Sequence, residues 1–100
     1  MSDFYEACYQ KLREVPLGYI TTYQELALAL GSKAVRAVGT AMNKNPYPRE
    51  QVPCHRVVRS DGSVGGYESG TENKIEQLRS EGLVIIQGKV QDFDNKIWRF

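Results

Sequence analysis

The chain has 100 residues, of which 41% are hydrophobic and 25% are charged, and its formal net charge is +1. This size and composition predict one small globular domain spanning residues 1–100, and they exclude a uniformly basic nucleic-acid-binding surface. A nucleic-acid contact would therefore have to be a local patch. The sequence has no basic, apolar leader and no apolar run long enough to cross a membrane. We expect an intracellular protein, cytoplasmic or nuclear in a eukaryote, without a membrane partner.

The first predicted helix begins at Asp3, whose side chain can cap it. Its apolar residues recur at helical spacing: Phe4, Ala7, Cys8, Leu12 and Val15. The second helix opens with a capping box, in which the Thr22 hydroxyl accepts from the Glu25 amide and the Glu25 side chain reaches back. Gly31 ends this helix as a left-handed cap.

A third helix follows at once, with Ser32 as its expected cap. Its apolar face contains Ala34, Val35, Val38, Ala41 and Met42. Two short helices joined through a glycine have the shape of a helix-turn-helix. The opposite face of the third helix carries Arg36, Gly39, Thr40 and Asn43. The side chains at the centre of this face are small, which would let a bulky partner approach the helix backbone. Spacing alone, however, favours a solvent-exposed face without a partner.

The stretch Asn45-Pro46-Tyr47-Pro48 predicts a turn, because proline cannot continue a helix. The chain should then run extended into residues 52–58. Residues 57–64 predict a short hairpin or tight turn. Thr71 is expected to cap a fourth helix that ends at Gly82.

A final hairpin is predicted to turn at Gln87-Gly88, and the apolar side chains of residues 97–100 should pack back onto the domain. The predicted fold class is mostly α with a small β component. We expect a compact helical domain that contains a helix-turn-helix and is winged-helix-like.

The residues most able to carry chemistry are Cys8, Cys54 and His55. A reducing compartment would keep both thiols free, and without CxxC spacing we expect no metal site. Cys8 lies on an apolar helix face, where a small buried side chain is the natural interpretation. Cys54 needs a base, and His55 is the only histidine in the chain. Adjacent residues of a strand point to opposite sides, so the pair needs a bend at Pro53 or a bridging water. By chemistry alone, a nucleophilic cysteine and a structural pair stay equally open.

The stretch "VPCHRVV" at residues 52–58 resembles the active-site signature of the O6-alkylguanine-DNA alkyltransferases, the methylated-DNA–protein-cysteine methyltransferases. Further matching stretches follow the family's order over residues 4 to 90: "VPLGYITTYQELA", "KAVRAVGTAMNKNP", "GSVGGYESG" and the "EGL" after the fourth helix. The resemblance is to the active-site domain of this family alone.

The resemblance implies a single-turnover DNA repair protein that binds duplex DNA and flips an alkylated guanine into a pocket. Cys54 would take the alkyl group irreversibly from O6-alkylguanine, with O4-alkylthymine as a second candidate substrate. No cofactor is expected, because the base itself is the leaving group. The expected partner is double-stranded DNA containing alkylated guanine, and the expected state is a monomer.

Residue by residue, the resemblance implies that Cys54 accepts the alkyl group, His55 activates it through a water and Glu81 orients His55. Asn45 would brace the turn before the cysteine. In the family the third helix enters the minor groove, where Tyr23 contacts the phosphate of the flipped nucleotide and Arg36 fills the vacated space. The remaining expected DNA contacts are Gly39, Thr40 and Lys33. The expected substrate pocket contains Pro53, Val64, Tyr67 and Lys74.

Two other functions stay open. An alkyltransferase-like protein would bind the lesion without transfer, but proteins of that kind commonly replace the acceptor cysteine with tryptophan, and Cys54 is present here. A Cys–His hydrolase would have no use for the helix-turn-helix. The sequence also departs from the family's pattern, with a charged segment at residues 48–51 and an acid, Glu68, after Tyr67.

Overall fold

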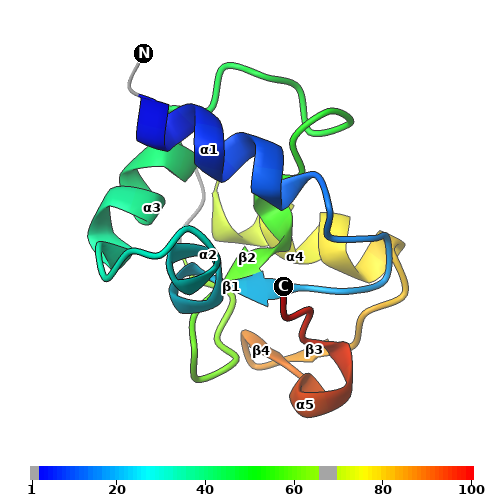
Figure 1. The fold of residues 1–100 in the computed structure, drawn as a ribbon. Coiled ribbons are helices and arrows are strands. Elements are labelled where there is room, and N and C mark those ends of the chain that lie inside the picture. The colour runs from blue at the N-terminus through cyan, green and yellow to red at the C-terminus, as the bar shows by residue number, and fades with distance from the viewer. Residues whose placement is uncertain (1–2, 66–69) are drawn as a thin grey trace.

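The computed structural model describes residues 3–65 and 70–100. Figure 1 shows a short pair of strands near the centre, with helices of the N-terminal half on one side and the C-terminal elements on the other. The helices are α1 (Asp3–Leu12), α2 (Tyr23–Ala29), α3 (Val35–Asn43), α4 (Thr71–Ser80), α5 (Phe93–Lys96) and the 3-10 turn η1 (Cys54–Arg56). The strands are β1 (Thr21–Thr22), β2 (Val57–Val58), β3 (Ile85–Ile86) and β4 (Lys89–Val90).

The two strands at the centre divide the apolar core. β1 and β2 are parallel, with Thr21 opposite Val57 and Thr22 opposite Val58. Val57 packs in a cluster with α1, α2 and α3, whereas Val58 packs in a second cluster with α4, β3 and β4. Successive residues of a strand point to opposite faces, so two residues of β2 are enough to bind both halves of the core together.

The predicted fold class is confirmed: the domain is mostly helical with small two-stranded sheets, and α2 and α3 form the helix-turn-helix (Figure 1). The expected start of α2 is present, because the Glu25 amide donates to the Thr22 hydroxyl over 3.0 Å. Gly31 has the left-handed φ of +68° that the sequence predicts for the end of this helix. The turn at Gln87-Gly88 joins antiparallel β3 and β4, as predicted.

Two predicted helix caps were wrong. Ser32 accepts from the Ala34 amide, so its hydroxyl closes the preceding turn and α3 begins at Val35 without a side-chain cap. Consequently Ala34 and Val35 are exposed rather than on the apolar face. Thr71 is the first residue of α4, and Gly70 is the cap.

For residues 57–64 the sequence predicted a short hairpin or a tight turn. A tight turn is present, closed by a 2.9 Å hydrogen bond from the Arg59 amide to the Ser63 carbonyl. However, β2 pairs with β1 and not across this turn, since β1 offers a neighbour that joins both core clusters. No helix within the described residues is long and apolar enough to span a membrane.

Candidate active site

The cysteine segment is helical rather than extended. Pro53 is followed by η1, in which the Arg56 amide donates to the Pro53 carbonyl over 2.9 Å. This bend removes the strand geometry that would send Cys54 and His55 to opposite sides. Cys54 is half-buried against the cluster of α1, α2 and α3. Its backbone is pinned by a 2.8 Å hydrogen bond from the Cys54 amide to the Val52 carbonyl.

The other cysteine is enclosed in the core. Cys8 is fully buried on α1, and burial raises the pKa of its thiol to about 11. A thiol with such a pKa stays protonated at neutral pH and is a poor nucleophile. The structural interpretation of Cys8 therefore fits its surroundings, and Cys54 is the cysteine that a reagent can reach.

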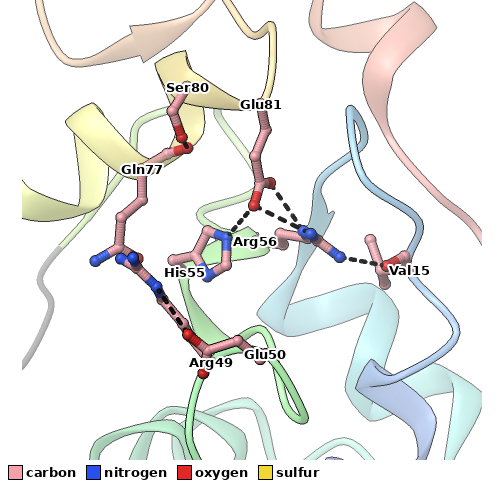
Figure 2. Close-up of polar contacts among 8 residues, drawn as sticks. All are labelled: Val15, Arg49, Glu50, His55, Arg56, Gln77, Ser80 and Glu81. Carbon is pink, nitrogen blue, oxygen red and sulfur yellow. Dashed lines mark hydrogen bonds and ion pairs between the residues drawn. The ribbon is translucent and has the colours of Figure 1, made fainter.

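His55 is buried and held by a carboxylate from α4. Its Nε2 lies 2.7 Å from Oε2 of Glu81. Figure 2 marks this contact with a dashed line. A carboxylate can only accept, so Nε2 carries the proton and Nδ1 carries the lone pair. Nδ1 has no hydrogen-bond partner among the described residues. Burial lowers the pKa of His55 despite the opposing charge of Glu81, which keeps the imidazole neutral and able to accept a proton.

Glu81 is shared between His55 and Arg56 (Figure 2). Arg56 donates from Nε to Oε1 over 2.9 Å and from Nη2 to Oε2 over 3.0 Å, and its Nη1 donates to the Val15 carbonyl. Burial alone would raise the pKa of Glu81, but the hydrogen bonds from Arg56 and His55 outweigh burial and lower it. Glu81 is therefore ionised at neutral pH. The sequence interpretation did not include Arg56 in the site, although it directly follows the Cys-His pair.

Asn45 ties together the loop that leads to the cysteine. Its Oδ1 accepts from the Tyr47 amide over 3.0 Å, and its Nδ2 donates to the Val52 carbonyl over 3.3 Å. Both bonds lie within the segment that ends at Cys54. This geometry suits the bracing role that the resemblance implied.

A buried lysine approaches the other side of the cysteine. Lys74 on α4 is fully buried, and its Nζ lies 3.5 Å from the Tyr23 hydroxyl. Burial lowers the pKa of Lys74 to about 8, and a negative charge on Cys54 would oppose that shift. Burial is also the main reason that the pKa of Tyr23 is raised. Cys54, Tyr23 and Lys74 thus lie within electrostatic range of one another, from three different elements.

The charged segment at residues 48–51 lies beside the imidazole. A cavity of about 220 Å³ opens there, and its lining includes Arg49, Glu50, His55 and Glu81. The positive charges of Arg56 and Arg49 contribute to lowering the pKa of His55. The departure of this segment from the family's pattern therefore acts electrostatically on the candidate base.

The other predicted pocket residues differ in their surroundings. Pro53 is buried before η1, and Val64 is 1% exposed within the second core cluster, so its side chain serves packing. Tyr67 and Glu68 lie outside the described residues. No group of three histidine, cysteine or acidic side chains that could hold a metal occurs in residues 3–65 and 70–100.

Four of the five predicted DNA-contacting residues lie on α3 or just before it, whereas Tyr23 begins α2 and lies beside Lys74. Arg36 and Lys33 are exposed, while Gly39 and Thr40 are half-buried. A Cβ added to Gly39 would meet no atom within 4 Å, so this face is open to a partner. The Thr40 hydroxyl donates to the Arg36 carbonyl over 3.1 Å. This bond holds the Thr40 side chain against the helix backbone, so it adds little bulk to this face.

Comparison with known proteins shows the family and agrees with this fold. Residues 3–83 match the model of the 6-O-methylguanine DNA methyltransferase family, DNA binding domain. The chain belongs to this family. The bifunctional methyltransferase/endonuclease of Picrophilus torridus is 43% identical over 98% of the chain, and the methylated-DNA–protein-cysteine methyltransferase of Methanosarcina barkeri is 43% identical over 80% of it. The chain covers 32% and 51% of those two proteins, respectively.

A solved structure of similar length also matches. S. pombe Atl1, crystallised with damaged DNA containing O6-carboxymethylguanine, has a TM-score of 0.85 and 32% sequence identity. The match covers 100% of this chain and 98% of the Atl1 chain. The whole described domain, including the helix-turn-helix and the C-terminal elements, thus has the Atl1 fold.

Proposed function

We propose that this chain is a DNA repair protein that transfers an alkyl group from O6-alkylguanine in duplex DNA to Cys54, once per molecule. The arrangement of Cys54, His55 and Glu81 carries this proposal: a reachable thiol next to a neutral imidazole whose proton is held on the far nitrogen. The names of the methyltransferase relatives support it. In this proposal residues 1–100 act as the active-site domain.

The chemistry follows from the geometry. Nδ1 of His55 takes the proton of the Cys54 thiol through a water molecule, and Glu81 stabilises the imidazolium that forms. The sulfur then forms a bond to the alkyl carbon as the bond from that carbon to the guanine oxygen breaks. The electron pair of the broken bond leaves with the guanine, which regains a proton from the site or from solvent. The thioether on Cys54 is stable, so the protein is not regenerated.

Positive charge near the sulfur favours this step. Lys74 is a buried cation within electrostatic range of Cys54, where it would stabilise both the thiolate and the negative charge developing on the guanine. Tyr67 is proposed, from the family resemblance, to meet the guanine with its hydroxyl. No cofactor enters the reaction, because sulfur is a soft nucleophile and the base is the leaving group.

The target atom is buried in a base-paired stack, so the nucleotide has to leave the duplex before it reaches Cys54. We assign this step to the surface of α3, which would enter the minor groove. Its small residues Gly39 and Thr40 suit a narrow groove, and Arg36 would fill the space left by the flipped nucleotide. Lys33 would add a phosphate contact before the helix.

A second function, binding of the lesion without transfer, is favoured by the match to Atl1 over nearly the full length of both chains. The two functions differ in the role of Cys54, because transfer needs its thiol as the acceptor and binding alone does not. Incubation with duplex DNA containing O6-methylguanine, followed by intact-mass measurement, tests them directly. Transfer adds the mass of one methyl group to the chain and peptide mapping places it on Cys54. A protein that binds this DNA and gains no mass would overturn the transfer proposal.

A further inference from the structure

Arg59 and Tyr23 are neighbours because of the strand register. Tyr23 directly follows β1 and Arg59 directly follows β2, and the last pair of these parallel strands is Thr22 opposite Val58. The two residues therefore leave the same end of the small sheet side by side. The charge of Arg59 opposes the raised pKa of Tyr23 and adds to the lowering of the pKa of Lys74. Arg59 thus acts on the same two residues, Tyr23 and Lys74, that lie within electrostatic range of Cys54.

The position of Arg59 is fixed by its surroundings. Its amide donates to the Ser63 carbonyl and its carbonyl accepts from the Gly62 amide, both over 2.9 Å. The next residue, Ser60, donates from its hydroxyl to Oε1 of Gln24 over 3.1 Å, which ties the turn to the start of α2. A rigid turn reduces the entropy that binding would lose.

The stem of the side chain lies along Gly65. A Cβ added to Gly65 would lie 3.3 Å from Nε of Arg59 and 3.5 Å from its Cγ. Gly65 has a φ of +76°, which a side chain rarely tolerates, and the absence of one there leaves room for the arginine. The stem of Arg59 is thereby packed although the residue is exposed.

The charge of Arg59 is not neutralised by an ion pair with any carboxylate in residues 3–65 and 70–100. Asp61 interacts with it only at longer range, since the hydroxyl and amide of Ser63 hold the Asp61 carboxylate. Lys74, the other cation beside Tyr23, is fully buried. Arg59 is therefore the solvent-facing positive charge next to Tyr23, on an element other than α3.

We propose that Arg59 binds a backbone phosphate of the DNA strand next to the flipped nucleotide, as a contact independent of the α3 surface. The inference rests on the proposed function for the identity of the ligand. A nucleotide whose base reaches Cys54 brings its adjoining phosphates close to Tyr23, and Arg59 lies beside Tyr23 with its charge exposed. A guanidinium matches two phosphate oxygens at once, and a packed stem aims it.

The test compares Arg59→Gln with wild type, because glutamine keeps most of the stem and removes the charge. Arg59→Ala is the second variant, and Lys11→Gln on α1 is the matched control that removes one positive charge elsewhere. Affinity for duplex DNA containing O6-methylguanine is measured over a range of salt concentrations. The rate of methyl transfer from that duplex and from the free O6-methylguanine base is measured on the same preparations.

We expect both Arg59 variants to reduce the slope of log affinity against log salt by about 0.9, the value for one lost phosphate contact on duplex DNA. The slope of Lys11→Gln should equal that of wild type, and both Arg59 variants should slow transfer from the duplex more than transfer from the free base. A wild-type slope in both Arg59 variants would overturn the inference. So would an equal fall in transfer from duplex and free base, which would make Arg59 a pocket residue.

The outcomes also separate this inference from the proposed function. Wild-type protein that binds the lesion DNA but transfers nothing would refute the transfer proposal, while the salt slopes would still decide the role of Arg59. Wild-type protein that accepts methyl from the free base but does not bind duplex DNA would overturn the Arg59 inference and leave the transfer chemistry standing.

Discussion

Nε2 of His55 lies 2.7 Å from Oε2 of Glu81, and the two residues are 26 positions apart in the chain. This contact sets the tautomer of the buried imidazole and leaves Nδ1 as its basic atom. The same carboxylate receives two hydrogen bonds from Arg56, so one acid both orients the candidate base and joins η1 to the end of α4. Chemistry and stability are therefore linked at Glu81.

Replacing Cys54 with alanine should abolish methyl transfer and leave affinity for lesion DNA within about twofold of wild type. The reason is that Cys54 supplies the nucleophile, whereas the proposed DNA surfaces lie on α3 and at Arg59. The matched control is Cys8→Ala, which removes the buried thiol and should keep transfer while lowering stability. Intact-mass measurement after incubation with methylated DNA reports both variants. Transfer that persists in Cys54→Ala and is lost in Cys8→Ala would assign the acceptor to Cys8.

Glu81→Gln should slow reaction of Cys54 at neutral pH and also lower the free energy of unfolding by about 1–3 kcal/mol, because hydrogen bonds to a charged group are lost. The readout is iodoacetamide labelling against pH in a Cys8→Ala background, with chemical denaturation alongside. Raising the pH should restore part of the labelling rate, since thiolate then forms without the base.

The control for Glu81 is Arg56→Gln. It removes the ion pair and a positive charge that lowers the pKa of His55, but it keeps the carboxylate beside His55, so stability should fall without the slower labelling expected for Glu81→Gln. A Glu81→Gln profile that coincides with wild type would show that Glu81 serves only the stability of the η1–α4 junction.

The stability of the domain should fall as the pH drops from about 7 to 5. Burial lowers the pKa of His55 in the folded state below the value of about 6.5 expected in the unfolded chain. The unfolded state therefore binds the proton more readily than the folded state in this range. The free energy of unfolding falls as the pH drops, by at most about 1.4 kcal/mol per pH unit.

Glu81 has a lowered pKa, so its contribution is present above the ordinary carboxyl range and is lost only in more acidic solution. Denaturant unfolding at several pH values measures the slope. Because His55 is the only histidine, His55→Gln should flatten the curve between pH 7 and 5. An equal slope in wild type and His55→Gln would assign the effect to other groups.

Arg36→Ala should slow transfer from duplex DNA at least tenfold while leaving transfer from the free O6-methylguanine base nearly unchanged. Keeping a nucleotide out of the stack costs a few kcal/mol, which a free base never requires. Arg36 is exposed on α3, so the variant should keep its stability. Both rates are measured on one preparation by mass spectrometry. An equal fall in the two rates would show that Arg36 acts on the pocket or the fold.

The features that the sequence predicted correctly depend on residues close together in the chain. The Thr22–Glu25 cap, the left-handed Gly31 and the turn at Gln87-Gly88 are each set by hydrogen bonds or by φ preferences within a few positions. The family motif around Cys54, at residues 52–58, is likewise a run of neighbouring residues. By contrast, the predicted caps at Ser32 and Thr71 were wrong by two residues and one residue, respectively. At Ser32 the error arose because a hydroxyl can close a turn as readily as it caps a helix.

By itself, therefore, the sequence determined the four longer helices α1 to α4, the fold class and the candidate nucleophile of this protein. The tertiary structure alone decided that β2 pairs with β1, that Arg56 shares Glu81 with His55, that Lys74 is buried beside Tyr23 and that Arg59 packs along Gly65 next to Tyr23. These relationships join segments far apart in the chain, and they exist because apolar burial on both faces of β2 brings those segments together. No local pattern of residues specifies which charged side chains from distant parts of the chain will be neighbours in the fold.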